Sequence, residues 1–181
     1  MASRRRDERA LVRSAQNGSS AAFDELFQLH WSRAHRAAYL VVHDAAAAED
    51  IAQESFLAAI RNLDRFDRRR PFGPWLHRIV VYRAIDHARA RAFRGETELA
   101  TDVAVATPDA GVPDAKLLAA IARLPPEQRA VIVLRHLLEY TPGEIATMLE
   151  LPRGTVNSRL RRGLDRLREA AEAETVEEAR Q

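Results

Sequence analysis

The stretch 141–168 constrains the fold of this chain more than any other part of the sequence. Thr141, Pro142 and Glu144 have the spacing of a capping box with proline at the first helical position, which predicts the start of a short helix. Pro152 ends that helix after a brief turn, and a second, basic helix is expected to follow. Two short helices joined by a tight turn form a helix-turn-helix, and the second helix of that motif can enter the major groove of DNA.

The second of these helices is predicted to be amphipathic. Val156, Leu160, Leu164 and Leu167 recur at helical spacing, and we expect this stripe to pack on the preceding helices. Off the stripe lie short polar residues and then arginines, which are the side chains that hydrogen-bond to bases and phosphates. The alternative, a solvated arginine face on an ordinary core helix, stays open. The candidate DNA-binding residues are Thr155, Asn157, Ser158, Arg159, Arg161, Arg162 and Arg166.

Charge is strongly segregated along the 181 residues, although the net charge is only +2. Residues 65–94 carry nine arginines and two aspartates, a net +7, and residues 153–168 carry six arginines and one aspartate, a net +5. Residues 95–116 and 169–181 each have five carboxylates and one basic residue, a net −4. Two basic blocks separated by an acidic spacer indicate two surfaces that bind polyanions.

Composition excludes several classes of protein. The chain has no cysteine, so it has neither a disulfide framework nor a thiolate zinc site. His30 and His35 have no partner at metal-ligand spacing, and we expect no metal and no cofactor. No apolar run approaches the length of a membrane span, and the first residues lack the apolar core of a signal peptide. We therefore expect no membrane insertion and a cytoplasmic location.

Helical periodicity continues through the N-terminal half. One helix is expected after Ser19 or Ser20, and another over 45–63 with Asp44 as its N-cap and Ile60 in its core stripe. On the outward face of the second helix, two acids, an amide and a leucine fall at i, i+3, i+4 and i+7. This pattern fits a protein-docking surface as well as it fits a solvated face. The four residues are Asp50, Gln53, Glu54 and Leu57.

The segment 64–73 is predicted to be a loop, because a proline and a glycine interrupt a continuous helix. It combines arginines with Phe66 and Phe72, a mixture suited to single-stranded nucleic acid, whose unstacked bases lie against aromatic rings. The alternative is that each ring only anchors the loop to the core. The following helix, over 74–94, does not separate its polar side chains to one side, and we expect it to pack on more than one face.

These patterns predict an all-α protein with two small helical domains joined by a flexible linker. Residues 95–113 lack apolar periodicity and are rich in residues typical of linkers. The predicted parts are an N-terminal domain over 1–94, the acidic linker over 95–113, a C-terminal domain over 114–170 that holds the helix-turn-helix, and an acidic tail over 171–181 that is expected to fray. We expect the two domains to meet only through the linker.

Four motifs occur in a fixed order along the chain. They are Ala48–Phe56, Trp75–Ile79 with Ala84–Arg89, Leu124–Arg129, and Gly154–Leu160. Each motif alone is weak, but together, with this spacing, they resemble the sigma-70 family of RNA polymerase sigma factors. The resemblance covers about 21–168 and is strongest to the short two-domain class called extracytoplasmic function (ECF) sigma factors.

The resemblance implies a promoter-specificity subunit without catalytic residues. Its partners would be promoter DNA and core RNA polymerase, which it would contact through the β′ clamp and the β subunit. An anti-sigma factor is compatible with the family. A small-molecule substrate is not expected. The docking face on helix 45–63 would bind the clamp, and the helix-turn-helix would read the −35 element. The N-terminal domain would melt the −10 element and hold a flipped base near loop 64–73. Its candidate −10 residues are Arg65, Phe66, Arg68, Arg69, Arg70, Phe72, Tyr82, Arg83 and Asp86.

Three other classes of protein compete with this interpretation. A plain helix-turn-helix regulator explains 114–168 but gives no role to the arginine-rich loop or the docking face. An enzyme would need Glu49, Asp50 and Glu54, yet Glu49 points away from Asp50 on a helix, and neither a histidine nor a cysteine joins them. A purely structural bundle does not account for the segregation of charge.

Overall fold

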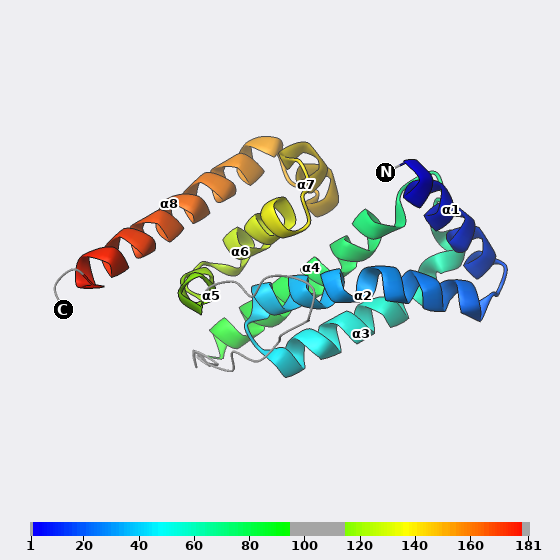
Figure 1. Ribbon diagram of the computed structural model, residues 1–181, viewed down its shortest axis with the longest axis horizontal. Coiled ribbons are helices and arrows are strands. Elements are labelled where there is room, and N and C mark those ends of the chain that lie inside the picture. The colour runs from blue at the N-terminus through cyan, green and yellow to red at the C-terminus, as the bar shows by residue number, and fades with distance from the viewer. Residues whose placement is uncertain (1, 95–114, 179–181) are drawn as a thin grey trace.

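The computed structural model describes residues 2–94 and 115–178, and every regular element in those ranges is helical (Figure 1). This arrangement confirms the predicted all-α class. The N-terminal half contains α1 (Ala2–Gln16), α2 (Ser20–Val42), α3 (Ala45–Asn62), the 3-10 turn η1 (Leu63–Arg65) and α4 (Phe72–Phe93). The C-terminal half contains α5 (Ala115–Ala122), α6 (Pro126–Ile132), the π-helical turn η2 (Val133–Leu137), α7 (Pro142–Leu149) and α8 (Arg153–Glu178).

Local capping signals set the starts of α2 and α3 where they were expected. The Ser19 side chain accepts a hydrogen bond from the N–H of Ala22 at 3.2 Å, and the Asp44 carboxylate accepts one from the N–H of Ala47 at 2.9 Å. Between the two helices, His43 adopts the left-handed conformation, with φ 53°, and ends α2. The chain therefore reverses over two residues, and α3 lies alongside α2 (Figure 1).

Aliphatic and aromatic side chains of α2, α3 and α4 form the N-terminal core. The Phe56 ring of α3 packs against Phe27 of α2, with ring centroids 4.7 Å apart. The predicted core stripe of α3 is buried except at Ile60, which is 46% exposed, so its assignment to the core was wrong. Consecutive helical residues lie about 100° apart, and Ile60 therefore turns away from buried Ala59 toward the side that carries Leu57.

The predicted helix-turn-helix is present. Thr141 accepts a hydrogen bond from the N–H of Glu144 at 3.3 Å, and the Glu144 carboxylate accepts one from the N–H of Thr141 at 2.8 Å, which confirms the capping box. Glu150 ends α7 in the left-handed conformation, with φ 53°, and α8 begins at Arg153. The turn between the two helices is therefore only a few residues long.

α8 packs on α6 along a line that differs from the predicted stripe at one position. Val156 and Leu160 are buried as expected, but Leu164 is 39% exposed, so its assignment to the core was wrong. Gly163 is buried in its place, and a Cβ atom there would lie only 2.6 Å from Cδ1 of Ile132. The buried line therefore runs i, i+4, i+7, because glycine allows α6 to approach α8 closely.

The two halves lie directly against one another, so the expectation that they meet only through the linker was wrong (Figure 1). α4 contacts α2 and α3 within its own half and α6 and α7 of the other half, which confirms that it packs on more than one face. The linker assigned to 95–113 lies outside the described residues. α8 continues to Glu178, well past residue 170, where the C-terminal domain was expected to end.

Candidate nucleic-acid and polymerase-binding surfaces

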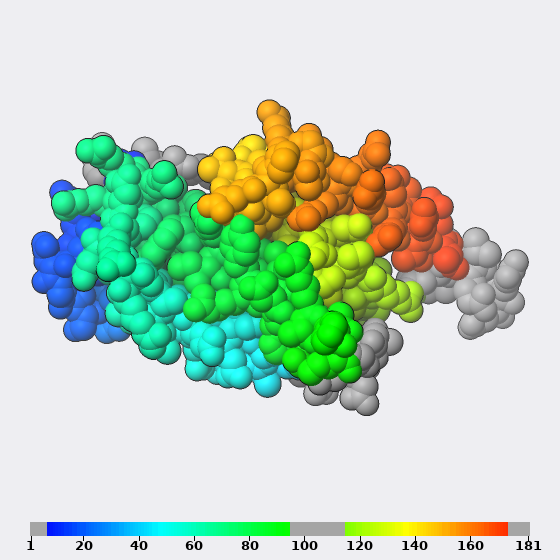
Figure 2. All heavy atoms as spheres, turned by 180° about the vertical axis from the view of Figure 1, so that it is seen from behind, coloured from blue at the N-terminus to red at the C-terminus, as the bar shows by residue number. Residues whose placement is uncertain are grey.

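The first turns of α8 expose three of the DNA-binding candidates, and a fourth is exposed further along the helix. The side opposite them carries Val156 and Leu160 into the core, as helical phase requires. In Figure 2 this part of the chain, coloured orange, projects from the molecule. The exposed candidates are Asn157, Arg161, Arg162 and Arg166, and the half-buried ones are Thr155, Ser158 and Arg159.

Two arginines of α8 also interact with α6. Nη1 of Arg166 donates a hydrogen bond to Oε1 of Gln128 at 3.3 Å. The charge of Arg159 acts on the carboxyl of Glu127. Burial alone would raise the pKa of this carboxyl. Its own backbone N–H, the hydrogen bond from Arg89 and the charges of Arg89 and Arg159 outweigh burial and lower the pKa. Arg159 is therefore partly engaged by α6, whereas Arg161 and Arg162 are exposed.

The outward face of α3 is exposed, as both a docking surface and a solvated face require. The amide of Gln53 donates a hydrogen bond to Oε1 of Glu49 at 3.1 Å, and Oε2 of Glu54 lies 3.8 Å from Nε of Arg83 on α4. Leu57 is 48% exposed, and Ile60 extends the same apolar surface by one turn. Sequence analysis missed Ile60, although its i+3 spacing from Leu57 was a usable signal.

The segment 64–73 was predicted to be a loop, but Arg65 belongs to η1, and Phe72 and Gly73 form the start of α4. The segment places its arginines and its rings in different environments. Phe66 and Phe72 are 7% and 1% exposed, and the Phe66 ring packs on Trp75 with centroids 4.6 Å apart. Gln16 of α1 donates hydrogen bonds to the carbonyls of Leu63 and Phe66, both at 2.9 Å. In this arrangement the rings anchor the loop, and neither can stack on a base. The exposed arginines of the segment are Arg65, Arg68, Arg69 and Arg70.

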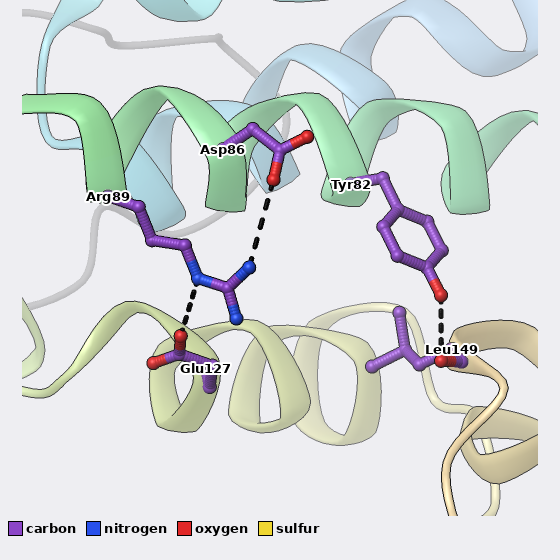
Figure 3. A network of polar contacts seen from close by, with 5 residues as sticks. All are labelled: Tyr82, Asp86, Arg89, Glu127 and Leu149. Atoms are coloured by element: carbon purple, nitrogen blue, oxygen red, sulfur yellow. Dashed lines mark hydrogen bonds and ion pairs between the residues drawn. The ribbon is translucent and has the colours of Figure 1, made fainter.

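The remaining −10 candidates lie on α4, which faces the C-terminal half (Figure 3). The Tyr82 hydroxyl donates a hydrogen bond to the carbonyl of Leu149 at 2.7 Å. Arg89 bridges the halves, with Nε 2.7 Å from Oε1 of Glu127 and Nη1 3.8 Å from Oδ1 of Asp86. Asp86 itself is exposed and Arg83 is half-buried beside Glu54 of α3, so the three candidates on α4 lie in three different environments.

A buried histidine marks the other end of this contact. Nδ1 of His77 shares a hydrogen bond of 2.7 Å with the Tyr140 hydroxyl, and His77 is only 3% exposed. Burial lowers the pKa of His77 to about 3, with smaller contributions from His30 and Arg33, so the ring is neutral near pH 7. Burial raises the pKa of Tyr140. No sequence pattern identified this pair; the only local signal is that Tyr140 precedes an N-cap, where a packed hydrophobic residue is common.

A second polar cluster lies where α2 ends beside α6. Burial lowers the pKa of His43 to about 4, with a further contribution from the charge of Arg129. Burial also lowers the pKa of Arg129, to about 10, which leaves it charged at neutral pH. Nη1 of Arg91 lies 3.1 Å from Oδ2 of the α3 cap Asp44. Within the two described ranges, neither a cluster of metal-ligating side chains nor a helix that could span a membrane is found.

Comparison with known families accounts for both halves. Residues 26–94 match the family model described as sigma-70 region 2, and residues 114–167 match the model described as sigma-70, region 4. The chain belongs to the sigma-70 family of RNA polymerase sigma factors. It is 31% identical over 173 residues to the ECF RNA polymerase sigma factor SigW of Bacillus subtilis, an alignment that covers 87% of this chain and 92% of SigW. It is 34% identical over 163 residues to SigM of Mycobacterium tuberculosis, with 90% and 83% covered, which places it in the ECF class.

Solved structures agree with this assignment. CnrH, in complex with the cytosolic domain of CnrY, superposes with a TM-score of 0.70 at 29% identity, covering 92% of this chain and 98% of CnrH. RpoE of Bartonella quintana, in complex with the anti-sigma factor NepR, gives a TM-score of 0.70 at 22% identity, covering 83% of this chain and 96% of RpoE, and supports the fold alone. The chain is therefore an ECF-class sigma factor that acts in transcription initiation. The match to region 2 removes the case for a plain helix-turn-helix regulator.

Proposed function

We propose that this sigma factor selects promoters through three surfaces: the outward face of α3, the arginine-rich loop with α4, and the exposed side of α8. The observation that carries the proposal is that one family model matches each half, while each half exposes a group of arginines, on segment 64–73 and on α8. Sigma factors are in general regulators of transcription rather than enzymes, and we propose no catalytic residue here. Since its partner would be bacterial core polymerase, we propose that it works in the cytoplasm.

On α8, we assign base reading to the exposed polar residues near the start of the helix. Arg161 and Arg162 are exposed and can each reach a guanine edge, and exposed Asn157 suits adenine. Arg166 lies further along and is held by Gln128, so its guanidinium suits a phosphate, a contact that positions the protein without reading sequence.

On α3, we assign polymerase docking to an apolar centre flanked by acids. Leu57 supplies exposed apolar area beside the carboxylates of Asp50 and Glu54. A partner with an apolar groove and a basic rim would be complementary to this face. Apolar side chains buried in the groove would supply most of the affinity, and charges at the rim would orient the partner and raise the rate of association.

For the −10 element, we assign the exposed loop arginines to the phosphates and α4 to the bases. The exposed charges of this segment can bind phosphates directly, because none of them is paired with a buried group among the described residues. They belong to Arg65, Arg68 and Arg69. Phe66 and Phe72 contribute through the shape of the loop, because their rings lie in the core. Tyr82 and Asp86 lie one helical turn apart on α4 and are the base-reading candidates there.

We also propose a protein that holds this sigma factor inactive. The CnrH and RpoE structures are both complexes, with the cytosolic domain of CnrY and with the anti-sigma factor NepR. The regulator of the present chain would be a protein of that kind, detected by co-purification with the full chain.

The decisive experiment is run-off transcription with core polymerase. The full chain should direct initiation from a subset of promoters in a genomic library, and core polymerase alone should not. Asp50→Arg should reduce polymerase binding at least tenfold with little change in helix content, because its side chain is exposed. Asp24→Arg, the same charge change at an exposed position of α2, is the matched control and should bind normally. Equal binding by both variants would remove the α3 face from the interface.

A further inference from the structure

One face of α1 contacts the backbone of the segment that joins α3 to α4. Arg9, Val12 and Gln16 fall at i, i+3 and i+7, so they lie on the same side of the helix. Val12 is only 2% exposed and packs this side into the core, and Oε1 of Glu8 lies 2.8 Å from Nε2 of His30 on α2. These contacts place α1 beside η1 (Figure 1).

The side-chain amide of Gln16 closes the 3-10 turn η1. Its Nε2 donates one hydrogen bond to the Leu63 carbonyl and another to the Phe66 carbonyl, both at 2.9 Å. The Leu63 carbonyl also accepts the N–H of Phe66 at 3.0 Å, which is the hydrogen bond of the turn itself. An amide nitrogen has two hydrogens to donate, and Gln16 uses both of them on this turn. One side chain therefore fixes the carbonyl where the turn begins and the carbonyl where the chain leaves it.

Arg65 lies between the two carbonyls that Gln16 binds, and its side chain is exposed. The chain leaves the turn in an extended conformation at Phe66, with φ −71° and ψ 127°. It then turns again at Asp67, whose Oδ1 accepts the N–H of Arg69 at 2.9 Å, and the Arg69 carbonyl accepts a hydrogen bond of 3.4 Å from Arg9 of α1. The backbone that carries these arginines is thus ordered before a ligand binds, which reduces the entropy lost on binding.

We propose that Gln16 is a positioning residue for the −10 surface, because it fixes the turn that presents Arg65 to the phosphates of the −10 strand. The proposal rests on the phosphate-binding role assigned above to the loop arginines. The region 2 model matches 26–94, so α1 lies outside the match, and the candidate site residues predicted from the sequence all lie on other elements. The two hydrogen bonds from Gln16 bring α1 into the working part of the N-terminal half.

The test measures binding of a single strand by the holoenzyme, formed from the full chain and core polymerase. A promoter found by run-off transcription with the natural chain supplies the probe, which is the non-template single strand of its −10 element. Gln16→Leu has nearly the same size as the natural side chain but donates no hydrogen bond. Gln28→Leu, the same change at an exposed position of α2, is the matched control. Helix content, melting temperature and polymerase binding are measured for every variant.

Gln16→Leu should weaken strand binding about fivefold and reduce the salt slope by about 0.7 unit, as the loss of one phosphate contact on a single strand predicts. Arg65→Ala should do the same. Because both changes act on one contact, the double variant should bind within twofold of Arg65→Ala alone. Gln28→Leu should bind as the natural chain does. A residue that served only the fold would lower the melting temperature and leave the salt slope unchanged.

Additive losses in the double variant, or an unchanged salt slope in Gln16→Leu, would overturn the positioning role and leave the role of Arg65 intact. Strand binding by Arg65→Ala equal to that of the natural chain would instead remove the phosphate-binding role of this residue, and the positioning role with it.

A second variant covers the case in which Gln16→Leu lowers the helix content. Gln16→Glu keeps the length and polarity of the side chain but is only an acceptor when ionised, and Gln28→Glu is its control for charge. It should show the same coupling to Arg65→Ala. Loss of helix content in both variants at position 16 would make Gln16 a residue of the fold and overturn the proposal.

Discussion

Acid should destabilise this protein through His77. The ring is buried, and burial lowers its pKa from 6.5 to about 3 on folding. At pH values between these two pKa values the unfolded chain binds a proton at this ring and the folded chain does not. The stabilisation is fully present above pH 6.5 and is lost progressively as the pH falls toward 3. Linkage gives a loss of about 2 kcal/mol between pH 7.5 and pH 5.0 from this residue alone.

The measurement is urea denaturation of the full chain at several pH values, compared with His77→Gln. The variant cannot titrate, so its free energy of unfolding should fall by about 2 kcal/mol less than that of the natural chain over the same range. His43, with a pKa of about 4, contributes in the same direction, but it is present in both proteins and cancels in the comparison. Coincident pH profiles for the two proteins would show that His77 is not held neutral by burial and would refute the reasoning.

Two further predictions concern α8. Replacing Arg161 or Arg162 by alanine should cost about 1–3 kcal/mol of promoter binding and relax specificity at one base pair, whereas Arg166→Ala should weaken all sequences evenly and lower the salt slope by about one unit. Duplex binding at two salt concentrations against single-base variants distinguishes these outcomes, and an even loss for Arg161→Ala would make that residue an electrostatic anchor. Leu160→Ala should destabilise the protein by about 2–5 kcal/mol, because it leaves a cavity in the core. Leu164→Ala should cost only about 0.5 kcal/mol, since that side chain is partly in water; equal melting shifts would contradict the packing described for α8.

The elements that sequence analysis predicted correctly depend on local rules. Each helix cap bonds to a residue three positions along the chain, so a short stretch of sequence is enough to predict it. This holds for Ser19, Asp44 and the capping box at Thr141. The exposed face of α3 follows from helical phase in the same way. These features locate the exposed face of α3, which we propose as the docking surface, and the helix-turn-helix without any knowledge of long-range contacts.

The features that sequence analysis missed or left open come from contacts that no local pattern encodes. Hydrophobic periodicity assigned Leu164 to the core because it counts apolar side chains and glycine has none. At Gly163 the absence of a side chain allows α6 to approach α8. Phe66 and Phe72 are chemically suited to stacking on bases, and only the tertiary structure shows that they are buried beside Trp75. The contacts of His77, Arg78 and Tyr82 with the C-terminal half join residues 63 to 72 positions apart, a range that periodicity does not cover.

The direct contact between the halves limits how far they can be treated as interchangeable parts. Exchanging the C-terminal half for that of another sigma factor at the linker is a natural way to build a regulator with a new promoter preference. Such a hybrid would keep His77, Arg78, Tyr82 and Arg89 of α4. It would lose Tyr140, Glu150 and Glu127, which bond to His77, Arg78 and Arg89, unless the incoming half supplies the same groups. Successful hybrids of this protein should therefore carry an aromatic hydroxyl before the capping box and acids matching Glu127 and Glu150.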